Sequence, residues 1–234
     1  MIKAVFIDID NTLLSFTGYV RQAMREGFAE LSLAEYDESM YQTFKGINDG
    51  LWEKIERGEL TLEGLKKIRW NMVFEALGID YDGVEFEKYF RAKLFSSAIH
   101  EPNAMELLEY LAPRYTLCAA SNGPYEQQVN RLKVGGMLEF FSHLFISSEI
   151  GAQKPSKEFF ETAFARLRES GFDIRPEEAI IIGDSMTSDM AGGTAYGMKT
   201  CLYRPNPDVS GGKAASCEGV DFVITDLAEI KGIL

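Results

Sequence analysis

The sequence predicts an α/β fold, with a doubly wound, mainly parallel, Rossmann-like sheet that is interrupted by an inserted α-helical cap domain. Two observations predict this fold. Short apolar runs rich in β-branched and aromatic residues alternate with stretches in which apolar residues recur every three or four positions. In addition, 108 residues run from Leu13 to Ala120, between the ends of the first two predicted strands, although a βαβ crossover needs only about a dozen.

The predicted strands are short and apolar. Residues 3–7 are apolar on both faces, as a strand in the middle of a parallel sheet must be. Similar runs follow at 115–120, 144–147, 179–182, 200–203 and 222–224. Between them, residues 103–111 and 157–167 place their apolar side chains along one helical stripe. This alternation predicts a parallel sheet covered by helices.

The sequence between Leu13 and Ala120 predicts helices rather than a long loop. Apolar residues at helical spacing predict helices at 20–33, 38–44, 61–77 and 84–95. One interpretation is a separate helical domain without a part in the chemistry. The alternative, which we favour, is a cap over the carboxyl end of the first strand, where open α/β sheets bind their ligands. The predicted domains are therefore a catalytic core, residues 1–15 and 97–234, and a helical cap, residues 16–96.

Composition excludes several classes of partner. The chain has 234 residues, with 24 Lys and Arg against 36 Asp and Glu, which gives a net charge of −12. Binding to a nucleic-acid polymer or an anionic membrane surface needs a basic footprint, so neither is expected. Cys118, Cys201 and Cys217 form no CxxC motif and are predicted to be buried thiols in a reducing compartment. With no apolar stretch of membrane-spanning length, a cytoplasmic location is expected. Residues 206–216 are predicted to form a surface loop, and the oligomeric state stays open.

Two carboxylates end the first predicted strand. Asp8 and Asp10 are two residues apart, so in an extended chain they project to the same side. Like charges so placed repel each other unless a cation or a shared proton intervenes. Two turn or capping aspartates are the ordinary alternative.

Polar residues also follow the later strands. They are Ser121, Asn122 and Gly123 after the second strand, Lys154 before a helix, and Asp184 and Asp189 after residues 179–182. A Gly-containing turn with a hydroxyl can hold phosphoryl oxygens. Taken singly, each feature has an ordinary explanation: a turn, a solvated lysine, or aspartates that cap a helix.

Together these residues resemble the four-part signature of the haloacid dehalogenase superfamily. That signature is DxDxT, then Ser or Thr, then Lys, then GDxxxxD. The chain reads Asp8-Ile9-Asp10-Asn11-Thr12, Ser121, Lys154 and Gly183-Asp184 with Asp189, in that order. The resemblance extends over the whole chain and includes the place of the insertion.

The resemblance implies a mechanism and a set of site residues. Asp8 would be the nucleophile that forms an aspartyl-phosphate, and Asp10 would protonate the leaving oxygen and then activate water. Mg²⁺ would be held by the carboxylates of Asp8 and Asp184 and by the backbone carbonyl of Asp10, with Asp189 orienting its neighbours or reaching the metal through water. The non-transferred phosphoryl oxygens would be bound by Ser121, the N–H of Asn122, and Lys154.

The charge of the site explains why a metal is expected. A dianionic phosphate ester next to these aspartates meets repulsion of ~4 kcal/mol per close pair at an effective dielectric constant near 20. A divalent cation reverses that sign. Dehalogenases of the superfamily lack the acid that Asp10 supplies, because a halide leaves without a proton. Asp10 therefore indicates phosphate esters as substrates.

The substrate must be inferred from the predicted cap. Residues 48–61 are similar to a cap segment of the bacterial pyrimidine 5′-nucleotidases of this superfamily, which implies hydrolysis of pyrimidine nucleoside 5′-monophosphates. A nucleobase needs an aromatic partner, and Phe16 and Trp52 are preferred over Tyr19 and Trp70. The alternative is that these rings pack the helices of the cap. Two other functions stay open: a phosphosugar or phosphoglycolate phosphatase or mutase, and a non-enzymatic phosphate-binding protein.

Overall fold

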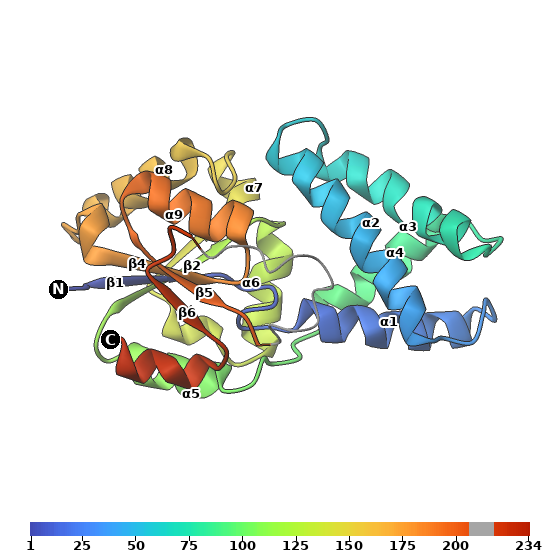
Figure 1. Cartoon of the computed structure of the whole chain (residues 1–234), viewed down its shortest axis with the longest axis horizontal. Helices are drawn as coiled ribbons and strands as arrows, with labels where there is room; N and C mark the ends of the chain where they lie inside the picture. The colour runs from blue at the N-terminus through green and yellow to red at the C-terminus, as the bar shows by residue number, and fades with distance from the viewer. Residues whose placement is uncertain (206–217) are drawn as a thin grey trace. The chain divides into compact units, whose positions relative to one another are not determined.

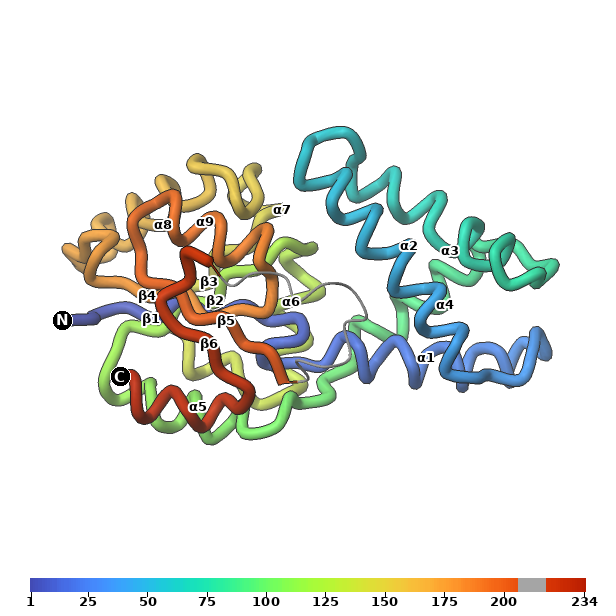
Figure 2. The backbone as a smooth tube through the Cα atoms, viewed as in Figure 1, coloured from blue at the N-terminus to red at the C-terminus, as the bar shows by residue number. Residues whose placement is uncertain are grey.

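The computed structural model describes residues 1–205 and 218–234. The predicted loop at 206–216 and Cys217 therefore lie outside the described residues. The chain divides into two compact units: one holds Met1–Ser15 and Ala98–Leu234, and the other holds Phe16–Ser97 (Figures 1 and 2). These divisions lie within one residue of the predicted domain limits. Whether the second unit works as a cap stays a prediction.

The first unit contains a six-stranded parallel sheet in the order β3-β2-β1-β4-β5-β6. The strands are β1 (Ala4–Ile7), β2 (Thr116–Ser121), β3 (His143–Ile146), β4 (Ala179–Gly183), β5 (Lys199–Tyr203) and β6 (Phe222–Ile224). Each lies within one residue of its predicted place or overlaps it, which confirms the doubly wound α/β fold. The strands β2 and β3 extend the sheet on one side of β1, and the chain then crosses from β3 to β4 on the other side, so the switch point of this topology lies beside β1.

The register of the central strands aligns their carboxyl ends. Ile7 of β1 lies opposite Ala119 of β2 and Ile182 of β4. The residues that follow these positions therefore emerge together at one edge of the sheet.

Helices cover both faces of the sheet (Figure 1). One face packs Val5 and Ile7 against α5 (Ala104–Leu111), α6 (Tyr125–Val134) and the 3₁₀ helix η4 (Leu227–Gly232). The other face packs Ala4 and Phe6 against α8 (Lys157–Glu169). The remaining short elements are η1 (Leu138–Phe140), α7 (Ser147–Ile150), η2 (Pro176–Glu178), the π-helical turn η3 (Met186–Met190) and α9 (Ala191–Tyr196). Cys118 and Cys201 are buried and unpaired, as predicted.

The second unit is built from four helices: α1 (Phe16–Glu30), α2 (Glu38–Glu56), α3 (Leu62–Leu77) and α4 (Gly83–Phe95). Asp37, Thr61 and Asp82 cap the last three, because the side chain of each accepts a backbone N–H of the first turn. The core of this unit is aromatic and centres on Trp70, whose ring lies 4.4 Å from that of Phe86. The helix α2 is longer than predicted, because its buried face continues past Phe44 to Leu51 and Ile55.

A buried ion pair lies within the helical unit. Arg69 donates to both carboxylate oxygens of Glu87 at 2.8–3.1 Å and to Asn48 Oδ1 at 3.0 Å. Both charged side chains are almost fully buried. Burial alone raises the pKa of Glu87, and the Arg69 charge opposes that rise.

The chain enters the helical unit after Ser15 and returns from it at Ala98, and the backbone segments at these two points are hydrogen bonded to each other. Leu14 and His100 form an antiparallel bridge. Ser15 N–H donates to Ile99 O at 2.7 Å, and Glu101 N–H donates to Leu13 O at 2.9 Å.

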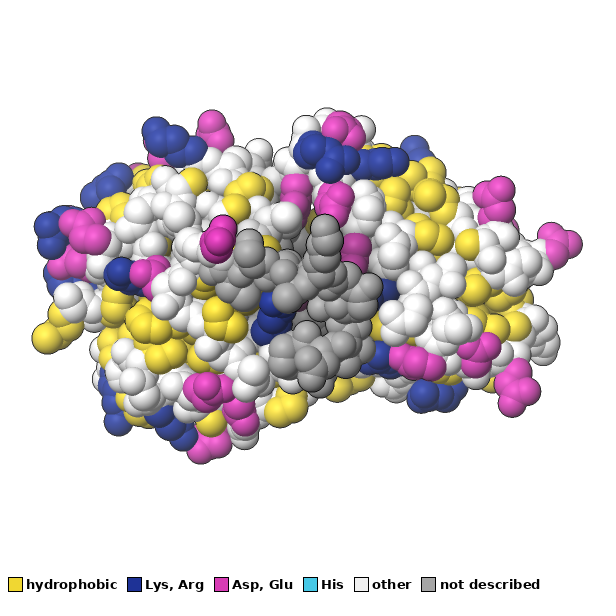
Figure 3. All heavy atoms as spheres, in the orientation of Figure 1, with side chains coloured by type: hydrophobic (Ala, Val, Ile, Leu, Met, Phe, Trp, Pro, Cys, Tyr) yellow, Lys and Arg dark blue, Asp and Glu magenta, His cyan; other side chains and the backbone are white. Residues whose placement is uncertain are grey.

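Acidic and basic side chains are interspersed on the surface drawn in Figure 3. In the described part of the chain, no helix combines the length and hydrophobicity that crossing a membrane requires.

Candidate active site

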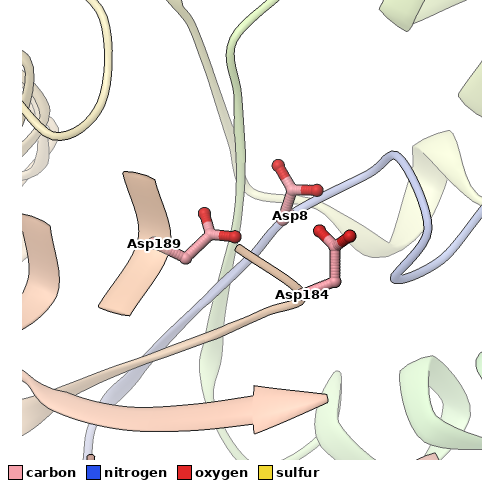
Figure 4. A group of neighbouring side chains, drawn as sticks. All are labelled: Asp8, Asp184 and Asp189. Carbon is pink, nitrogen blue, oxygen red and sulfur yellow. The ribbon is translucent and has the colours of Figure 1, made fainter. Parts of the chain in front are cut away.

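Three carboxylates converge at the carboxyl edge of the sheet. Asp8 follows β1, Asp184 follows β4, and Asp189 lies in η3. One oxygen from each lies within 4.8 Å of the others, and the three side chains point toward one another (Figure 4). The set therefore offers several hard oxygen ligands around one point, which suits a divalent cation of the Mg²⁺ type.

Local backbone contacts put these carboxylates in place. Asp8 N–H donates to Ile182 O at 2.9 Å, which extends the pairing of β1 with β4 by one residue. Ser185 begins the π-helical turn, accepting Ser188 N–H on its side chain and donating its own N–H to Asp189 Oδ2 at 3.1 Å. A Cβ on Gly183 would lie 2.2 Å from Asp189 Oδ2, so any larger residue there would have to displace the Asp189 side chain.

Lys154 lies at the centre of the cluster. Its Nζ donates to Asp8 Oδ1 at 2.7 Å, to Asp189 Oδ1 at 2.6 Å and to Ala120 O at 2.5 Å. Its side chain is only 1% exposed. An ammonium group has three N–H donors, so these acceptors account for all of them. The alternative of a solvated surface lysine is therefore wrong.

Burial and charge perturb the pKa values of the cluster. Burial raises the pKa of Asp8 to about 7; Lys154 opposes the rise and Asp189 adds to it. Burial, followed by the charges of Asp8 and Asp189, raises the pKa of Asp184 well above its usual value. Burial alone would lower the pKa of Lys154, but the charges of Asp189 and Asp8 outweigh it and raise that pKa. The cluster thus carries more negative charge than Lys154 balances, which a proton or a bound cation can compensate.

The side chain of Asp10 is held outside the three-carboxylate group. Its Oδ1 accepts from Arg131 Nη1 at 2.5 Å, and its Oδ2 accepts from Gln128 Nε2 at 2.8 Å. Its charge still contributes to the raised pKa of Asp8. The next residue, Asn11, has a φ of 57°, in the left-handed region that Asn tolerates, and this turns the chain sharply after Asp10.

The segment after β2 is tied to both neighbours. Ser121 Oγ accepts from Gln128 Nε2 at 2.7 Å. Asn122 exchanges two hydrogen bonds with the backbone of Lys154: its Nδ2 donates to Lys154 O at 2.7 Å, and its Oδ1 accepts Lys154 N–H at 2.8 Å. The structure therefore brings Asp8, Ser121, Asn122, Lys154, Asp184 and Asp189 into one connected region, with Asp10 joined to it through Gln128.

Comparison with known proteins identifies the family. The family model described as haloacid dehalogenase-like hydrolase matches residues 2–197, which include every motif residue above. The chain belongs to the haloacid dehalogenase-like hydrolases.

Three relatives resemble the chain over most of its length. The HAD-hydrolase YfnB of Bacillus subtilis is 30% identical over 87% of this chain and 85% of its own length. The pyrimidine 5′-nucleotidase PynA of Streptococcus pneumoniae is 29% identical over 87% of this chain and 84% of its own. A glyceraldehyde 3-phosphate phosphatase of Methanothermobacter thermautotrophicus is 26% identical over the full length of both chains.

The crystal structure of YfnB bound to magnesium has the same fold. It matches with a TM-score of 0.87 and covers 100% of this chain and 98% of YfnB at 30% identity. The magnesium belongs to that structure. In this hydrolase, the Asp8, Asp184 and Asp189 cluster could hold a metal ion.

The sequence alone did not single out two residues that contact the candidate site, Gln128 and Arg131. Both lie on α6, three residues apart and therefore on one face of the helix, and both are buried. A polar pair on the buried face of a helix, beginning five residues after a Ser-Asn-Gly turn, is the signal that could have found them.

The two aromatic residues predicted to contact a nucleobase lie in the helical unit of the hydrolase. Phe16 packs against Tyr19 and Phe90, with ring centroids 6.3 and 6.2 Å away. Trp52 packs, partly buried, beside Leu51 and Ile55. Both make the packing contacts of the alternative interpretation, and their role toward substrate stays a prediction.

Proposed function

We propose that this hydrolase is a Mg²⁺-dependent phosphate monoesterase that works through an aspartyl-phosphate and acts on pyrimidine nucleoside 5′-monophosphates. The observation that carries the proposal is Asp8. Asp8 directly follows β1, one of its carboxylate oxygens accepts from buried Lys154, and two further carboxylates lie within 4.8 Å. A fixed carboxylate beside a site for a divalent cation suits nucleophilic attack on phosphorus.

Two steps follow from this arrangement. An Asp8 oxygen attacks phosphorus and the ester P–O bond breaks, while Asp10 gives its proton to the departing oxygen. Asp10 then takes a proton from a water molecule, which attacks the acyl-phosphate, releases inorganic phosphate and restores the Asp8 carboxylate. The contact between Lys154 Nζ and Asp8 Oδ1 limits rotation of the nucleophile during both steps.

The carboxylates of Asp8 and Asp184 and the backbone carbonyl of Asp10 would hold Mg²⁺, with Asp189 supporting them. The bound cation supplies positive charge against the phosphoryl oxygens as negative charge develops in transfer. The hydroxyl of Ser121 already accepts from Gln128, so its own proton is available to donate to a phosphoryl oxygen. The N–H of Asn122 completes the proposed phosphate-binding set together with Lys154, whose ammonium would exchange one of its three protein acceptors for a phosphoryl oxygen.

The choice of a nucleotide substrate rests on two similarities. The segment 48–61 resembles the cap of bacterial pyrimidine nucleotidases, and PynA is 29% identical to this chain. We propose accordingly that the helical unit acts as a cap and that Phe16 and Trp52 contact the base. A sugar-phosphate phosphatase is the second candidate, supported by the full-length similarity to the archaeal glyceraldehyde 3-phosphate phosphatase. A cytoplasmic location stays a prediction, which the buried thiols Cys118 and Cys201 support.

A panel of phosphate esters tests the proposal. Phosphate release from UMP, dUMP and dTMP is measured beside that from glyceraldehyde 3-phosphate, phosphoglycolate and p-nitrophenyl phosphate, with Mg²⁺ and with EDTA. We expect kcat/KM to be highest for the nucleotides and activity to disappear in EDTA. Faster turnover of the sugar phosphates would select the second candidate, and no turnover of any ester would leave a phosphate-binding protein.

The variant Asp8→Asn isolates the nucleophile. It should abolish turnover while its circular dichroism spectrum stays that of the wild type. Substantial residual activity in folded Asp8→Asn would contradict the assignment of Asp8.

A further inference from the structure

A buried guanidinium–amide pair on α6 contacts two groups of the proposed mechanism at once. We propose that Arg131 and Gln128 are positioning residues that hold the Asp10 side chain in line for proton transfer between its carboxyl group and the leaving oxygen, and connect it to Ser121. The inference rests on the proposed function and goes beyond the four motifs, because neither residue belongs to them.

Arg131 approaches Asp10 from the protein interior. Its side chain is 1% exposed, whereas that of Asp10 is 32% exposed. Arg131 Nη1 lies 2.5 Å from Asp10 Oδ1 and 3.0 Å from Gln128 Oε1. Burying a guanidinium group lowers the stability of the folded state unless its N–H donors meet acceptors, so the contacts of Arg131 with Asp10 and Gln128 also stabilise the fold. Asp10 is thus held on one side and left accessible on the other, where a substrate oxygen can reach it.

Gln128 fixes a second side of the same carboxylate. Because a guanidinium only donates, the amide oxygen of Gln128 must face Arg131, and its nitrogen then faces Asp10 Oδ2. The two N–H bonds of that nitrogen are used on Asp10 at 2.8 Å and on Ser121 Oγ at 2.7 Å. One amide therefore sets the distance between the proton-transfer group and the hydroxyl proposed to bind phosphate.

This arrangement has a specific chemical consequence. Asp10 follows a strand on a turning loop, and two donors from α6 restrict the rotation of its side chain. An acid must lie within hydrogen-bond reach of the oxygen it protonates. An alkoxide leaving group needs that proton, whereas p-nitrophenolate departs readily as an anion. Loss of positioning should therefore slow alkyl phosphates far more than p-nitrophenyl phosphate.

The test compares Arg131→Met with wild type on the best alkyl ester of the panel and on p-nitrophenyl phosphate, both with saturating Mg²⁺. We expect kcat/KM to fall ~100-fold on the alkyl ester and less than ~10-fold on p-nitrophenyl phosphate, given the usual size of general-acid catalysis. Arg166→Met is the matched control, because Arg166 pairs with Glu149 at 2.5 Å on the exposed side of α8. This control should leave the ratio of the two rates unchanged.

A double variant separates positioning from folding. In an Asp10→Asn background, Arg131→Met should cost little further activity on the alkyl ester, because the group that it positions is already gone. If Arg131→Met does not fold, Gln128→Met, which removes both donors, is judged by the same ratio.

Equal losses on both esters, or full additivity with Asp10→Asn, would overturn the inference. Failure of the proposed function would look different, since the wild type itself would then hydrolyse no ester or Asp8→Asn would stay active.

Discussion

Replacing Lys154 with methionine tests the electrostatic design of the site most directly. The substitution keeps the length of the side chain and removes the ammonium that lies 2.7 Å from Asp8 Oδ1 and 2.6 Å from Asp189 Oδ1. It leaves two buried carboxylates without a cation, next to a third, Asp184. The variant should therefore be much less stable in the absence of metal.

The size of the effect follows from these distances. Each contact represents ~6 kcal/mol of gross attraction at an effective dielectric constant of ~20, most of which desolvation offsets. Removing one partner of a buried pair costs ~3–5 kcal/mol, because the other charge stays buried and uncompensated. We expect a loss of this size, or a fall of roughly 10 °C in Tm. Added Mg²⁺ should restore more stability to the variant than it adds to the wild type, because the cation meets a more negative site.

The assay must report on the sheet-containing unit. Both tryptophans, Trp52 and Trp70, lie in the helical unit, so their fluorescence follows that unit. Denaturation is instead followed by far-UV circular dichroism, to which both units contribute, at pH 8, above the pKa of about 7 of Asp8 in the wild type. Because Lys154 lowers that pKa, Asp8 of the variant ionises at higher pH. Lys157→Met is the control, since Lys157 is 74% exposed and pairs with Glu161 one helical turn away. Such pairs contribute only ~0.3–0.5 kcal/mol.

The reasoning is refuted if Lys154→Met loses no more stability than Lys157→Met in EDTA. It is also refuted if Mg²⁺ stabilises the variant less than the wild type.

Three further results are expected. The metal-free protein should lose stability as pH rises from about 4 to about 7, which thermal midpoints in EDTA measure. Burial raises the pKa of Asp8 to about 7 in the folded state, whereas Asp8 of the unfolded chain already loses its proton near its usual pKa. Between these two pH values the unfolded state is therefore favoured more with each rise in pH. Gly183→Ala should weaken Mg²⁺ binding ~10–100-fold in a titration, because the new methyl group displaces Asp189. Arg69→Met should destabilise the helical unit by ~3–5 kcal/mol in tryptophan fluorescence, because Glu87 stays buried without its partner.

Each result has a control. Mg²⁺ should flatten the pH profile, and a flat profile in EDTA would show that Asp8 ionises without cost. Gly46→Ala lies inside α2 with no atom near the new Cβ, so it should leave Mg²⁺ binding unchanged and add ~0.5–1 kcal/mol of stability. The double variant Arg69→Met/Glu87→Met should recover most of the loss of Arg69→Met, since no charge is left unpaired.

The sheet and its site aspartates could be predicted because their signals are local. A strand such as Ala179–Gly183 is a continuous apolar run, and Asp184 follows it directly. Parallel strands end at one edge, so the positions of Asp8 and Asp184 along the chain already predict that they meet. The end of α2 was harder to predict, because glycines at 46 and 50 suggest a stop that the buried contacts of Leu51 override.

Contacts that depend on tertiary structure could not be predicted in this way. Arg131 lies 121 residues from Asp10 in the chain, and no local pattern marks that pairing. The three acceptors around Lys154 come from segments that only the folded sheet assembles, so composition alone favours a solvated lysine. The same limit applies to Arg69 and Glu87, which lie 18 residues apart on two different helices.

The backbone pairing of Leu14 with His100, where the chain enters and leaves the helical unit, has a consequence for exchanging that unit. Since Ser15 and Ile99 are hydrogen bonded within the sheet-containing unit, the entry and exit of the 82-residue helical segment are neighbours before that segment is considered. A short turn could join them, as in a hairpin. A different insertion could therefore be joined at this pair of backbone segments while the residues at the sheet edge keep their positions.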